Sequence, residues 1–397
     1  MYSINDINDI TGLYENELRK LSLDIHNNPE LGKEEFKACK WQTELLEKYG
    51  FTIERNFCGM ETAYHAVFKG DKEGPSIAML SEYDALPGLG HGCGHNLITM
   101  ISVGSGLVIK EIVKKYGGEI HVVGTPAEET EGAKVEMARQ GVFRDFDVVM
   151  MAHPYFKNLS AMNTSAICAR RVEFFGKAAH AAASPEEGIN ALDAVINFFN
   201  MVNALRQQLR DDIRIHGIIE NGGVAPNIIP DYTSARFYVR AGKMEDVEKV
   251  LKRVEGCIKG AAEGTGAEYK ISKVEEDFKD TNTNMALCEL AYNMYKSLGH
   301  EIEWVGSTKI AGSSDLGDVS YQCPAIQMIC GTCGDDEQSP CELHTVEFEK
   351  QAGSSKALDN GFEFIKAFAL TAQELITNPG YIEKIKKEFI ENTPKQV

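Results

Sequence analysis

The sequence contains no long apolar run. Nowhere do about 18 uncharged apolar residues follow one another, and residues 1–20 lack the basic start and apolar stretch of an export signal. We therefore expect neither a membrane span nor secretion. Positive charge is also scarce, because 41 Lys and Arg stand against 59 Asp and Glu, for a formal net charge of −18. Such a surface repels phosphate backbones and anionic lipids, so we expect neither nucleic acid nor a membrane as partner.

The signatures of an oxidoreductase and of a disulfide-rich protein are missing too. No G-x-G-x-x-G follows the first apolar runs, which argues against a dinucleotide cofactor. The ten cysteines lack the spacing of a small disulfide scaffold, so we expect free thiols and a cytoplasmic location. Cys330 and Cys333 form a C-x-x-C that could be a redox pair or a zinc site. Because the segment resembles a polar loop without a second pair, free thiols are the favoured interpretation.

What the sequence does contain is regular alternation of strand and helix patterns. Its 397 residues favour two domains, each large enough for its own core. Short apolar runs alternate with stretches of helical periodicity, which predicts an α/β fold with a mostly parallel sheet covered by helices. The first three runs span residues 76–80, 119–124 and 147–152.

The middle of the chain follows a different pattern. From about residue 168 the order becomes strand, helix, strand, strand, helix, strand, which predicts a ferredoxin-like βαββαβ domain. Helix and strand then alternate again, ending in a long helix from about Phe348. We therefore predict a catalytic domain in two parts, residues 1–167 and 282–397, with an inserted lid or dimerisation domain at 168–281.

Side chains that can bind metals follow each of the first three apolar runs. Ligands of open α/β sheets bind beyond the carboxyl ends of the strands, so these clusters would converge on one crevice. A single site can be assembled from them. The residues concerned are Glu82, Asp84, Cys93 and His95 after the first run, Glu128 and Glu129 after the second, and His153 after the third.

Two short motifs carry most of this signal. Cys93 and His95 lie between glycines that permit a tight backbone path, so both can point at one ion. Taken alone the motif is weak, because buried cysteines are common without a metal. Glu128 and Glu129 alone could be a solvated surface or a helix start. Beside a metal, however, two adjacent carboxylates can act as ligand and general base, and the joint occurrence favours that interpretation.

The other histidines have a structural interpretation beside the chemical one. His121 and His216 lie inside apolar strands, so we expect them to pack rather than to react. His65 has no polar cluster near it in the sequence. His91 neighbours the proposed site, and we expect it to support a ligand rather than to bind the metal.

Several longer motifs, taken in order, resemble one known family. The family is that of the aminoacylases and bacterial carboxypeptidases, peptidase family M20. Within it, the chain is most similar to the amidohydrolase branch of hippurate, auxin-conjugate and p-aminobenzoyl-glutamate hydrolases and β-alanyl-lysine dipeptidase-like proteins. The resemblance spans nearly the whole chain. The motifs are NNPELGKEEF (27–36), EYDALPGLGHGCGHNL (82–97), GTPAEETEGAK (124–134), MMAHP (150–154), GKAAHAAASPEEGINALDA (176–194), APNIIPDYTSARFYVR (225–240), GSSDLGDVSY (312–321) and LHTVEF (343–348).

The resemblance implies a role for each matching residue. Glu128 would be the general base, and two divalent cations would be bound by Cys93, His95, Glu129, His153 and His344. Zinc and manganese fit this ligand set, and nickel and cobalt are also compatible with it. Glu82 departs from the aminoacylase pattern, which has a histidine ligand there, so Asp84 is expected to support a ligand instead of binding the metal.

The inserted domain would also take part in the chemistry. The resemblance implies that His180 stabilises the transition state and that Asn227 contacts the substrate. We expect a homodimer through this domain, since its two long helices and edge strands could pair with a second copy.

The implied activity is that of a metal-dependent amidohydrolase. The metal-activated water would cleave the amide bond of a small N-acyl amino acid or dipeptide-like substrate, of the aminobenzoyl-glutamate or β-alanyl-lysine type. A hippurate or other N-acyl-amino acid hydrolase is the alternative. A non-catalytic metal-binding relative ranks lower, because it would have no need of Glu128 as a proton shuttle.

Overall fold

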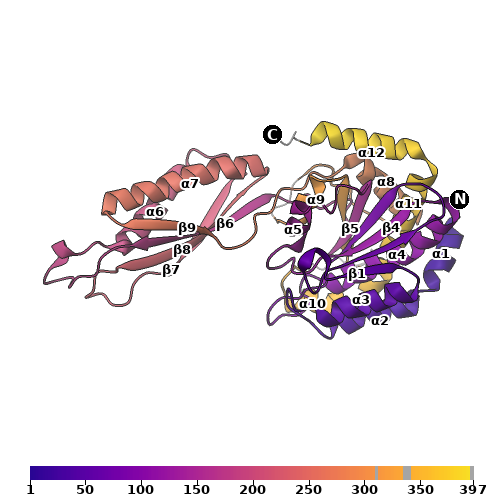
Figure 1. The fold of residues 1–397 in the computed structure, drawn as a ribbon, viewed down its shortest axis with the longest axis horizontal. Helices are drawn as coiled ribbons and strands as arrows, with labels where there is room; N and C mark the ends of the chain where they lie inside the picture. The colour runs from indigo at the N-terminus through magenta and orange to yellow at the C-terminus, as the bar shows by residue number, and fades with distance from the viewer. Residues whose placement is uncertain (309–311, 334–340, 394–397) are drawn as a thin grey trace. The chain divides into compact units, whose positions relative to one another are not determined.

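The computed structural model describes residues 1–308, 312–333 and 341–393 (Figure 1). The chain forms two compact units. The first comprises Met1–Asn163, Thr281–Ile310 and Asp315–Val397, and the second comprises Thr164–Asp280 with Ala311–Ser314. The second unit is thus inserted into the sequence of the first.

A six-stranded sheet forms the centre of the first unit. Its order is β1-β2-β4-β3-β5-β10. The four strands β4, β3, β5 and β10 are parallel, whereas β1 and β2 run antiparallel at one edge. The strands are β1 (Thr52–Arg55), β2 (Tyr64–Lys69), β3 (Ser76–Ser81), β4 (Glu119–Gly124), β5 (Val148–Tyr155) and β10 (Ala325–Gly331).

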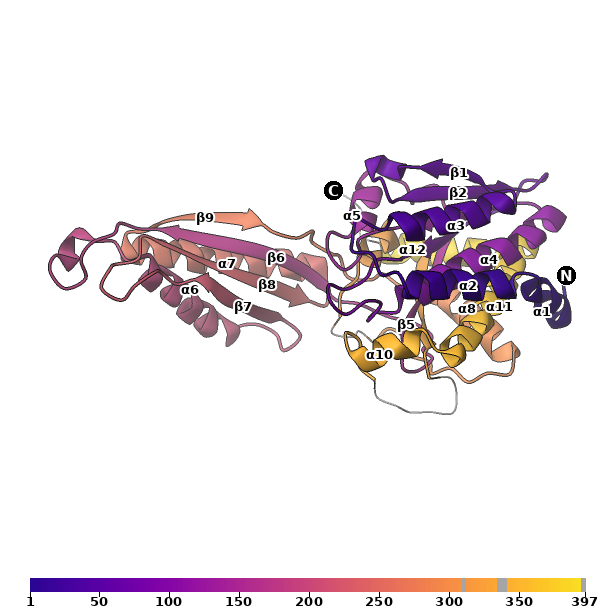
Figure 2. The same cartoon turned by 90° about the horizontal axis from the view of Figure 1, so that it is seen from below.

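Both faces of this sheet are buried, which explains its continuous apolar runs. In β5, Val148 and Met150 belong to one apolar cluster, whereas Val149 and Met151 belong to another on the opposite face. The period of two along a strand produces this division. The first cluster involves α1 (Ile4–Gly12), α2 (Glu15–His26), α3 (Phe36–Lys48), α8 (Met285–Ser297) and α12 (Pro379–Asn392). The second involves α5 (Ala133–Arg139) and α9 (Leu316–Ser320). Figure 2 labels the helices of the first cluster along the ribbon.

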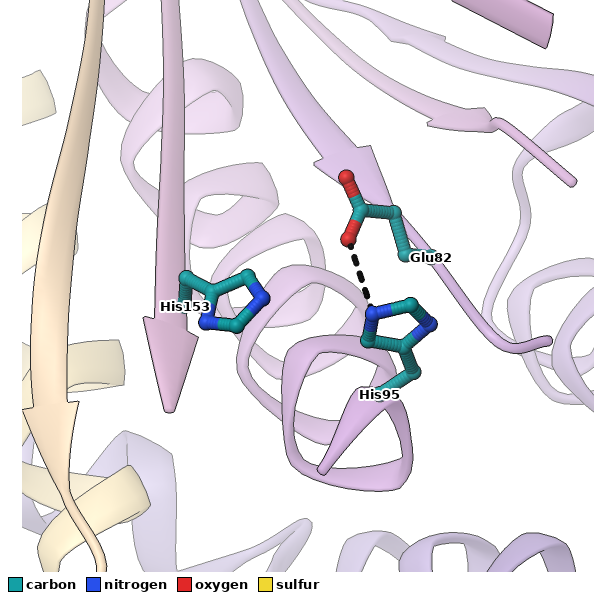
Figure 3. Close-up of side chains that lie close together, drawn as sticks. All are labelled: Glu82, His95 and His153. Carbon is teal, nitrogen blue, oxygen red and sulfur yellow. Dashed lines mark ion pairs between the residues drawn. The ribbon is translucent and has the colours of Figure 1, made fainter. Parts of the chain in front are cut away.

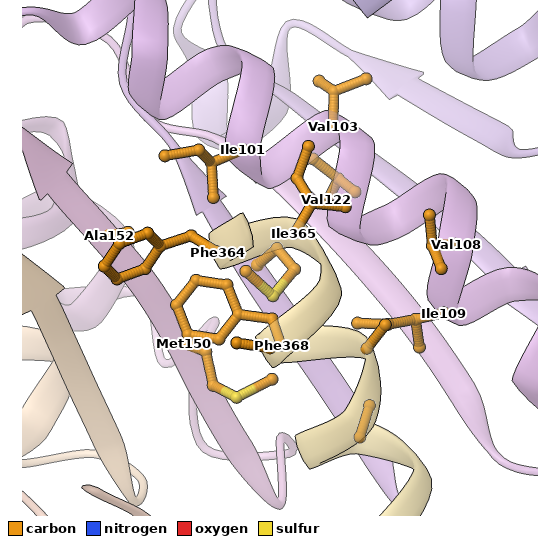
Figure 4. Packing of buried hydrophobic residues seen from close by; sticks show 14 of the residues in the cluster. Ile101, Val103, Val108, Ile109, Val122, Met150, Ala152, Phe364, Ile365 and Phe368 are labelled. Carbon is orange, nitrogen blue, oxygen red and sulfur yellow. The ribbon is translucent and has the colours of Figure 1, made fainter. Parts of the chain in front are cut away.

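Two long helices build the middle of the first cluster. They are α4 (His95–Tyr116) and α11 (Ser355–Thr377), and Figure 4 shows Phe364 and Phe368 of α11 packed near Met150 of β5. By length and composition α4 is the one helix in the described ranges that could cross a membrane, but 94% of its apolar window is buried inside the protein. It is therefore a core helix.

The long helix expected from about Phe348 is three helices. They are α10 (Val346–Ala352), α11 and α12. The first break falls at Gly353, where a side chain would meet the His26 ring at 2.8 Å. Ser354 then caps α11, because its hydroxyl accepts a hydrogen bond from the Ala357 amide at 3.2 Å. Pro379 begins α12, where a proline is favourable in the first turn.

The second unit is a four-stranded antiparallel sheet with two helices. The sheet order is β7-β8-β6-β9, and the elements follow one another as βαββαβ, which confirms the predicted ferredoxin-like fold. Val172 and Phe174 of β6 pack against Phe198 and Val254 from the two helices. The elements are β6 (Ala166–Phe175), α6 (Ala191–Arg206), β7 (Arg214–Asn221), β8 (Tyr232–Ala241), α7 (Met244–Thr265) and β9 (Glu268–Lys273).

Candidate metal centre

The candidate centre lies at the carboxyl ends of three neighbouring parallel strands. Glu82 directly follows β3, Glu128 and Glu129 follow β4, and His153 lies near the end of β5. Because β4, β3 and β5 are adjacent in the sheet, their ends meet, as the sequence pattern predicts for parallel strands.

A tight turn brings Cys93 and His95 to the same place. Gly94 caps the start of α4 with φ +72°, in the left-handed region that glycine adopts without strain. A side chain there would also meet Pro154 at 3.0 Å. The turn leaves Cys93 buried and places His95 as the first residue of α4.

Each of two histidines has one ring nitrogen engaged and one available. His95 Nδ1 lies 3.0 Å from Asp84 Oδ1, and Asp84 Oδ2 accepts the Glu129 amide at 2.9 Å. In His153, Nδ1 lies 2.8 Å from the Pro154 carbonyl oxygen, so the proton of the neutral ring resides on Nδ1. Such outer contacts orient metal-binding imidazoles, and they leave Nε2 of each ring as the ligand atom. This geometry supports the expected role of Asp84.

The expected ligands gather around His95. Cys93, His95 and Glu129 place their ligand atoms within 4.8 Å of one another, and so do Glu82, His95 and His153 (Figure 3). His344, the remaining expected ligand, lies on a more exposed backbone turn at φ +64°, and its amide donates to the Gly92 carbonyl.

The Glu129 carboxylate faces two imidazoles. Its Oε1 lies 3.7 Å from His95 Nε2, and its Oε2 lies 3.9 Å from His344 Nε2. Glu129 therefore links the group around His95 with His344.

The charges of the site fit divalent cations. Glu82, Asp84, Glu128, Glu129 and Asp315 supply carboxylates to this region, whereas Lys134 supplies an ammonium group that pairs with Glu82 and Asp315. His95 Nε2 and Glu82 Oε2 are buried without a hydrogen-bond partner in this part of the structure. Buried charges and polar atoms without partners are costly, and divalent cations would offset both.

The chemistry of two side chains depends on such cations. Burial and the neighbouring Glu129 carboxylate raise the pKa of the Cys93 thiol well above its usual value. A bound cation is then needed to give the thiolate that binds metal. Burial also raises the pKa of Glu128 well above its usual value, and the Glu82 carboxylate adds to this shift. Cations bound beside it would favour the ionised carboxylate that a general base requires.

Lys134, Asp315 and Glu35 contact residues of the site, although no role was assigned to them from the sequence. Lys134 Nζ lies 2.6 Å from both Glu82 Oε1 and Asp315 Oδ1, with all three side chains fully buried. Glu35 accepts the Ala127 amide at 2.8 Å and the Thr62 hydroxyl at 2.8 Å. Ala127 has φ +57°, so Glu35 stabilises a strained turn directly before Glu128. Each of these residues lies within a motif that carries the family resemblance.

The remaining histidines named above have other contacts. His91 is buried with Nε2 3.1 Å from the Ile25 carbonyl oxygen. His121 is buried in β4, and its Nδ1 lies 2.9 Å from Nε2 of His65 on the neighbouring strand. His216 is exposed on β7 rather than packed in an apolar interior.

The C-x-x-C pair differs from the expected loop. Cys330 is buried within β10, and Cys333 is buried just after the strand. Both are free thiols, as are the other cysteines of the chain. The polar segment that follows lies in part outside the described residues.

Comparison with known proteins identifies relatives of this chain by sequence and by fold. The family described as the peptidase dimerisation domain matches residues 164–266, within the second unit. A dinuclear metal-binding peptidase of the M20 family from Bacillus subtilis has a similar fold, with a TM-score of 0.68 and 19% identity over 91% of this chain and 99% of the other. The Xaa-Arg dipeptidase of Mus musculus is 36% identical over 389 residues, which cover 94% of this chain and 88% of that protein.

The chain belongs to the M20 peptidase family. A p-aminobenzoyl-glutamate hydrolase chain of Escherichia coli is also similar to this M20 peptidase, at 28% identity over 94% of this chain and 92% of the other. The predictions of the family, of the α/β fold with a mostly parallel sheet, and of a hydrolase are therefore confirmed. The dinuclear neighbour and the ligand groups also support divalent metal ions.

We expect Cys93→Ser to lower the metal content of this M20 peptidase clearly, because a serine hydroxyl is a much poorer ligand than a thiolate. Metal analysis of the purified variant by mass spectrometry tests this. Cys58→Ser, at a half-buried cysteine of the 3₁₀ helix η1 (Phe57–Gly59), is the matched control. Full metal content and full activity in Cys93→Ser would show that the cysteine only packs.

Proposed function

We propose that this M20 peptidase hydrolyses the amide bond of a dipeptide or a small N-acyl amino acid. In this proposal two divalent cations are held by Cys93, His95, Glu129, His153 and His344. The observation that carries it is the convergence of metal-binding side chains on His95, whose buried Nε2 has no hydrogen-bond partner among the described residues. Bound divalent cations supply an activated water and polarise the scissile carbonyl group.

Glu128 is the general base of this proposal. It lies next to Glu129 in sequence and within 4.8 Å of Glu82 and Asp315 in ligand-atom distance. Its carboxylate takes a proton from the attacking water and passes it to the departing nitrogen. The turn at Ala127, held by Glu35, sets the direction of this side chain.

His180 and Asn227 act on the substrate in this proposal. The Ala181 amide donates to the Asn227 carbonyl at 3.0 Å, so the two segments lie together in the second unit. His180 Nδ1 accepts the amides of Ala182 and Ala183, both at 3.2 Å. The proton of the neutral ring is then on Nε2, which can donate to the amide oxygen as negative charge develops there.

We further propose a homodimer formed through the second unit, in the cytoplasm. The family matched at residues 164–266 is a dimerisation domain. Strand β7 is an edge of its sheet and exposes Ile218 and Ile219, and α6 exposes Ile196 and Met201. Apolar side chains beside an unpaired strand edge favour pairing with a second copy. The free thiols of the chain fit a reducing compartment.

The substrate proposed is a dipeptide with a basic second residue. It is supported by the higher identity to the Xaa-Arg dipeptidase, 36%, than to the p-aminobenzoyl-glutamate hydrolase chain, 28%. Zinc or manganese is the proposed metal. The thiolate of Cys93 favours zinc, whereas the histidines and the carboxylate accept either ion.

We expect protein loaded with Zn²⁺ or Mn²⁺ to release arginine or lysine from Xaa-Arg and Xaa-Lys dipeptides. The kcat/KM for these substrates should exceed that for p-aminobenzoyl-glutamate and for hippurate. A screen of free amine release measures this, with Glu128→Gln protein purified in parallel to detect contaminating peptidases. If the metal-loaded protein releases no amine from any of these substrates, the proposed substrate class is wrong.

A further inference from the structure

Glu82 lies at metal-coordination spacing from His95. Glu82 Oε2 is 3.4 Å from His95 Nε2, both side chains are fully buried, and His153 also places a ligand atom within 4.8 Å of them (Figure 3). Two ligand atoms that are each about 2.0–2.1 Å from a tetrahedral ion lie roughly 3.4 Å apart. The observed separation is therefore the one expected for two ligands of the same ion.

The state of the His95 ring makes this contact informative. Because Nδ1 lies 3.0 Å from Asp84, Nε2 is the ring nitrogen directed at the Glu82 carboxylate. A cation that lies between these two atoms is attracted by the carboxylate and can be bound by the nitrogen. One ion on Nε2 would have Glu82 within reach.

Lys134 forms an ion pair with only one of the two carboxylate oxygens of Glu82. Its ammonium group lies 2.6 Å from Glu82 Oε1, whereas Oε2 is the oxygen directed at His95. The same ammonium group lies 2.6 Å from Asp315 Oδ1. The group of Glu82, Glu128 and Asp315 thus already contains a cation from the protein itself, and the histidine side of Glu82 is where a metal ion fits.

We propose that Glu82 is a metal ligand of this chain, with Oε2 binding the same ion as His95 and His153 while Lys134 holds Oε1. This inference rests on the proposed function only insofar as the site binds divalent cations. It adds an oxygen ligand to the five ligands that the family resemblance implies. The ion concerned would have nitrogen and oxygen ligands, a set that suits Mn²⁺ as well as Zn²⁺.

Zn²⁺ affinity, measured without substrate, tests the proposal. Metal-free protein is titrated with Zn²⁺ in competition with a chromophoric chelator, for the parent, Glu82→Gln and Asp315→Asn. We expect Glu82→Gln to raise the Kd of one ion at least tenfold, since even residues that only support a ligand change metal affinity by about 10–100-fold. Asp315→Asn is the matched control, because it also removes a carboxylate oxygen 2.6 Å from Lys134 but does not face His95. Its Kd values should rise clearly less than those of Glu82→Gln, since it removes no ligand in this assignment and acts on Glu82 only through Lys134.

A spectroscopic signature and a second variant complete the test. The visible absorption bands of bound Co²⁺ should change in Glu82→Gln and not in Asp315→Asn. If Glu82→Gln does not fold, Glu82→Asp keeps the charge but withdraws the oxygen, and it should also weaken binding. Unchanged Kd values in the folded Glu82 variant, or equal losses in it and in Asp315→Asn, would overturn the proposal. Parent protein that binds Zn²⁺ but cleaves no amide contradicts the proposed function and leaves this assignment standing.

Discussion

Glu128→Gln is expected to lower kcat by about 10²–10⁴-fold, because the amide of glutamine cannot accept the proton of the attacking water. The change keeps the size of the side chain, and Glu128 is not one of the proposed metal ligands. Metal content and thermal stability should therefore stay close to those of the parent. Steady-state kinetics on the best dipeptide substrate, with metal analysis of the same sample, measures the effect.

Comparing the change in kcat with the change in KM tests whether Glu128 acts as a general base. Removing a group that transfers a proton in the transition state should lower kcat with little change in KM. Glu131→Gln is the matched control, since Glu131 lies three residues further on and forms an ion pair with Lys33 at the surface. Turnover of Glu128→Gln within tenfold of the parent would contradict the assignment.

His180→Ala should lower kcat by about 10²–10³-fold, the usual loss when one donor to a developing oxyanion is removed. The amides of Ala182 and Ala183 donate to Nδ1 of the exposed His180 side chain, which leaves Nε2 as the donor. Since that donor acts mainly in the transition state, KM should change less than kcat. A histidine that only caps its own loop would instead change stability, which thermal unfolding of the variant measures.

Subunit mixing tests whether His180 acts on the partner's active site. All proposed metal ligands lie in the first unit, whereas His180 lies in the second, which matches a dimerisation domain. If His180 works in trans, a mixed dimer of His180→Ala and Glu128→Gln subunits has one site with both residues intact. An equal mixture would then regain roughly a quarter of the parent activity, since half of the dimers are mixed and each has one working site.

The control mixture combines Glu128→Gln with Cys93→Ser. Both substitutions affect residues of the first unit, so no mixed dimer gains an intact site. That mixture should stay inactive under the same exchange conditions. If the His180→Ala mixture also stays inactive although exchange is demonstrated by mass, the trans arrangement is wrong.

The pattern of apolar residues along the sequence predicts most of the fold. β3, β4 and β5 were predicted from apolar runs, because a parallel sheet covered on both faces leaves no solvent side along these strands. The ferredoxin-like unit was predicted from its order of strands and helices. The antiparallel strands β1 and β2 were not predicted, because β1 is a short, largely exposed edge strand and β2 alternates between buried and partly buried residues instead of forming an apolar run.

The residue types that can bind metal were also visible in the sequence. Cys93, His95, Glu129 and His153 follow apolar runs, and the carboxyl ends of adjacent parallel strands meet at one edge of a sheet. Chain connectivity therefore predicts that these side chains share a crevice. It does not predict which atoms face each other.

Only the tertiary structure decided the contacts within that crevice. Lys134 and Asp315 are separated by 181 positions in the chain, yet they lie 2.6 Å apart, and Glu82 directs one oxygen at Lys134 and the other at His95. The imidazoles of His65 and His121 likewise contact each other across the neighbouring strands β2 and β4. Periodicity and local motifs report burial and backbone conformation, which are properties of short segments. An ion pair or a shared ligand position depends on the distance between segments, and that distance is set by how the helices and strands pack.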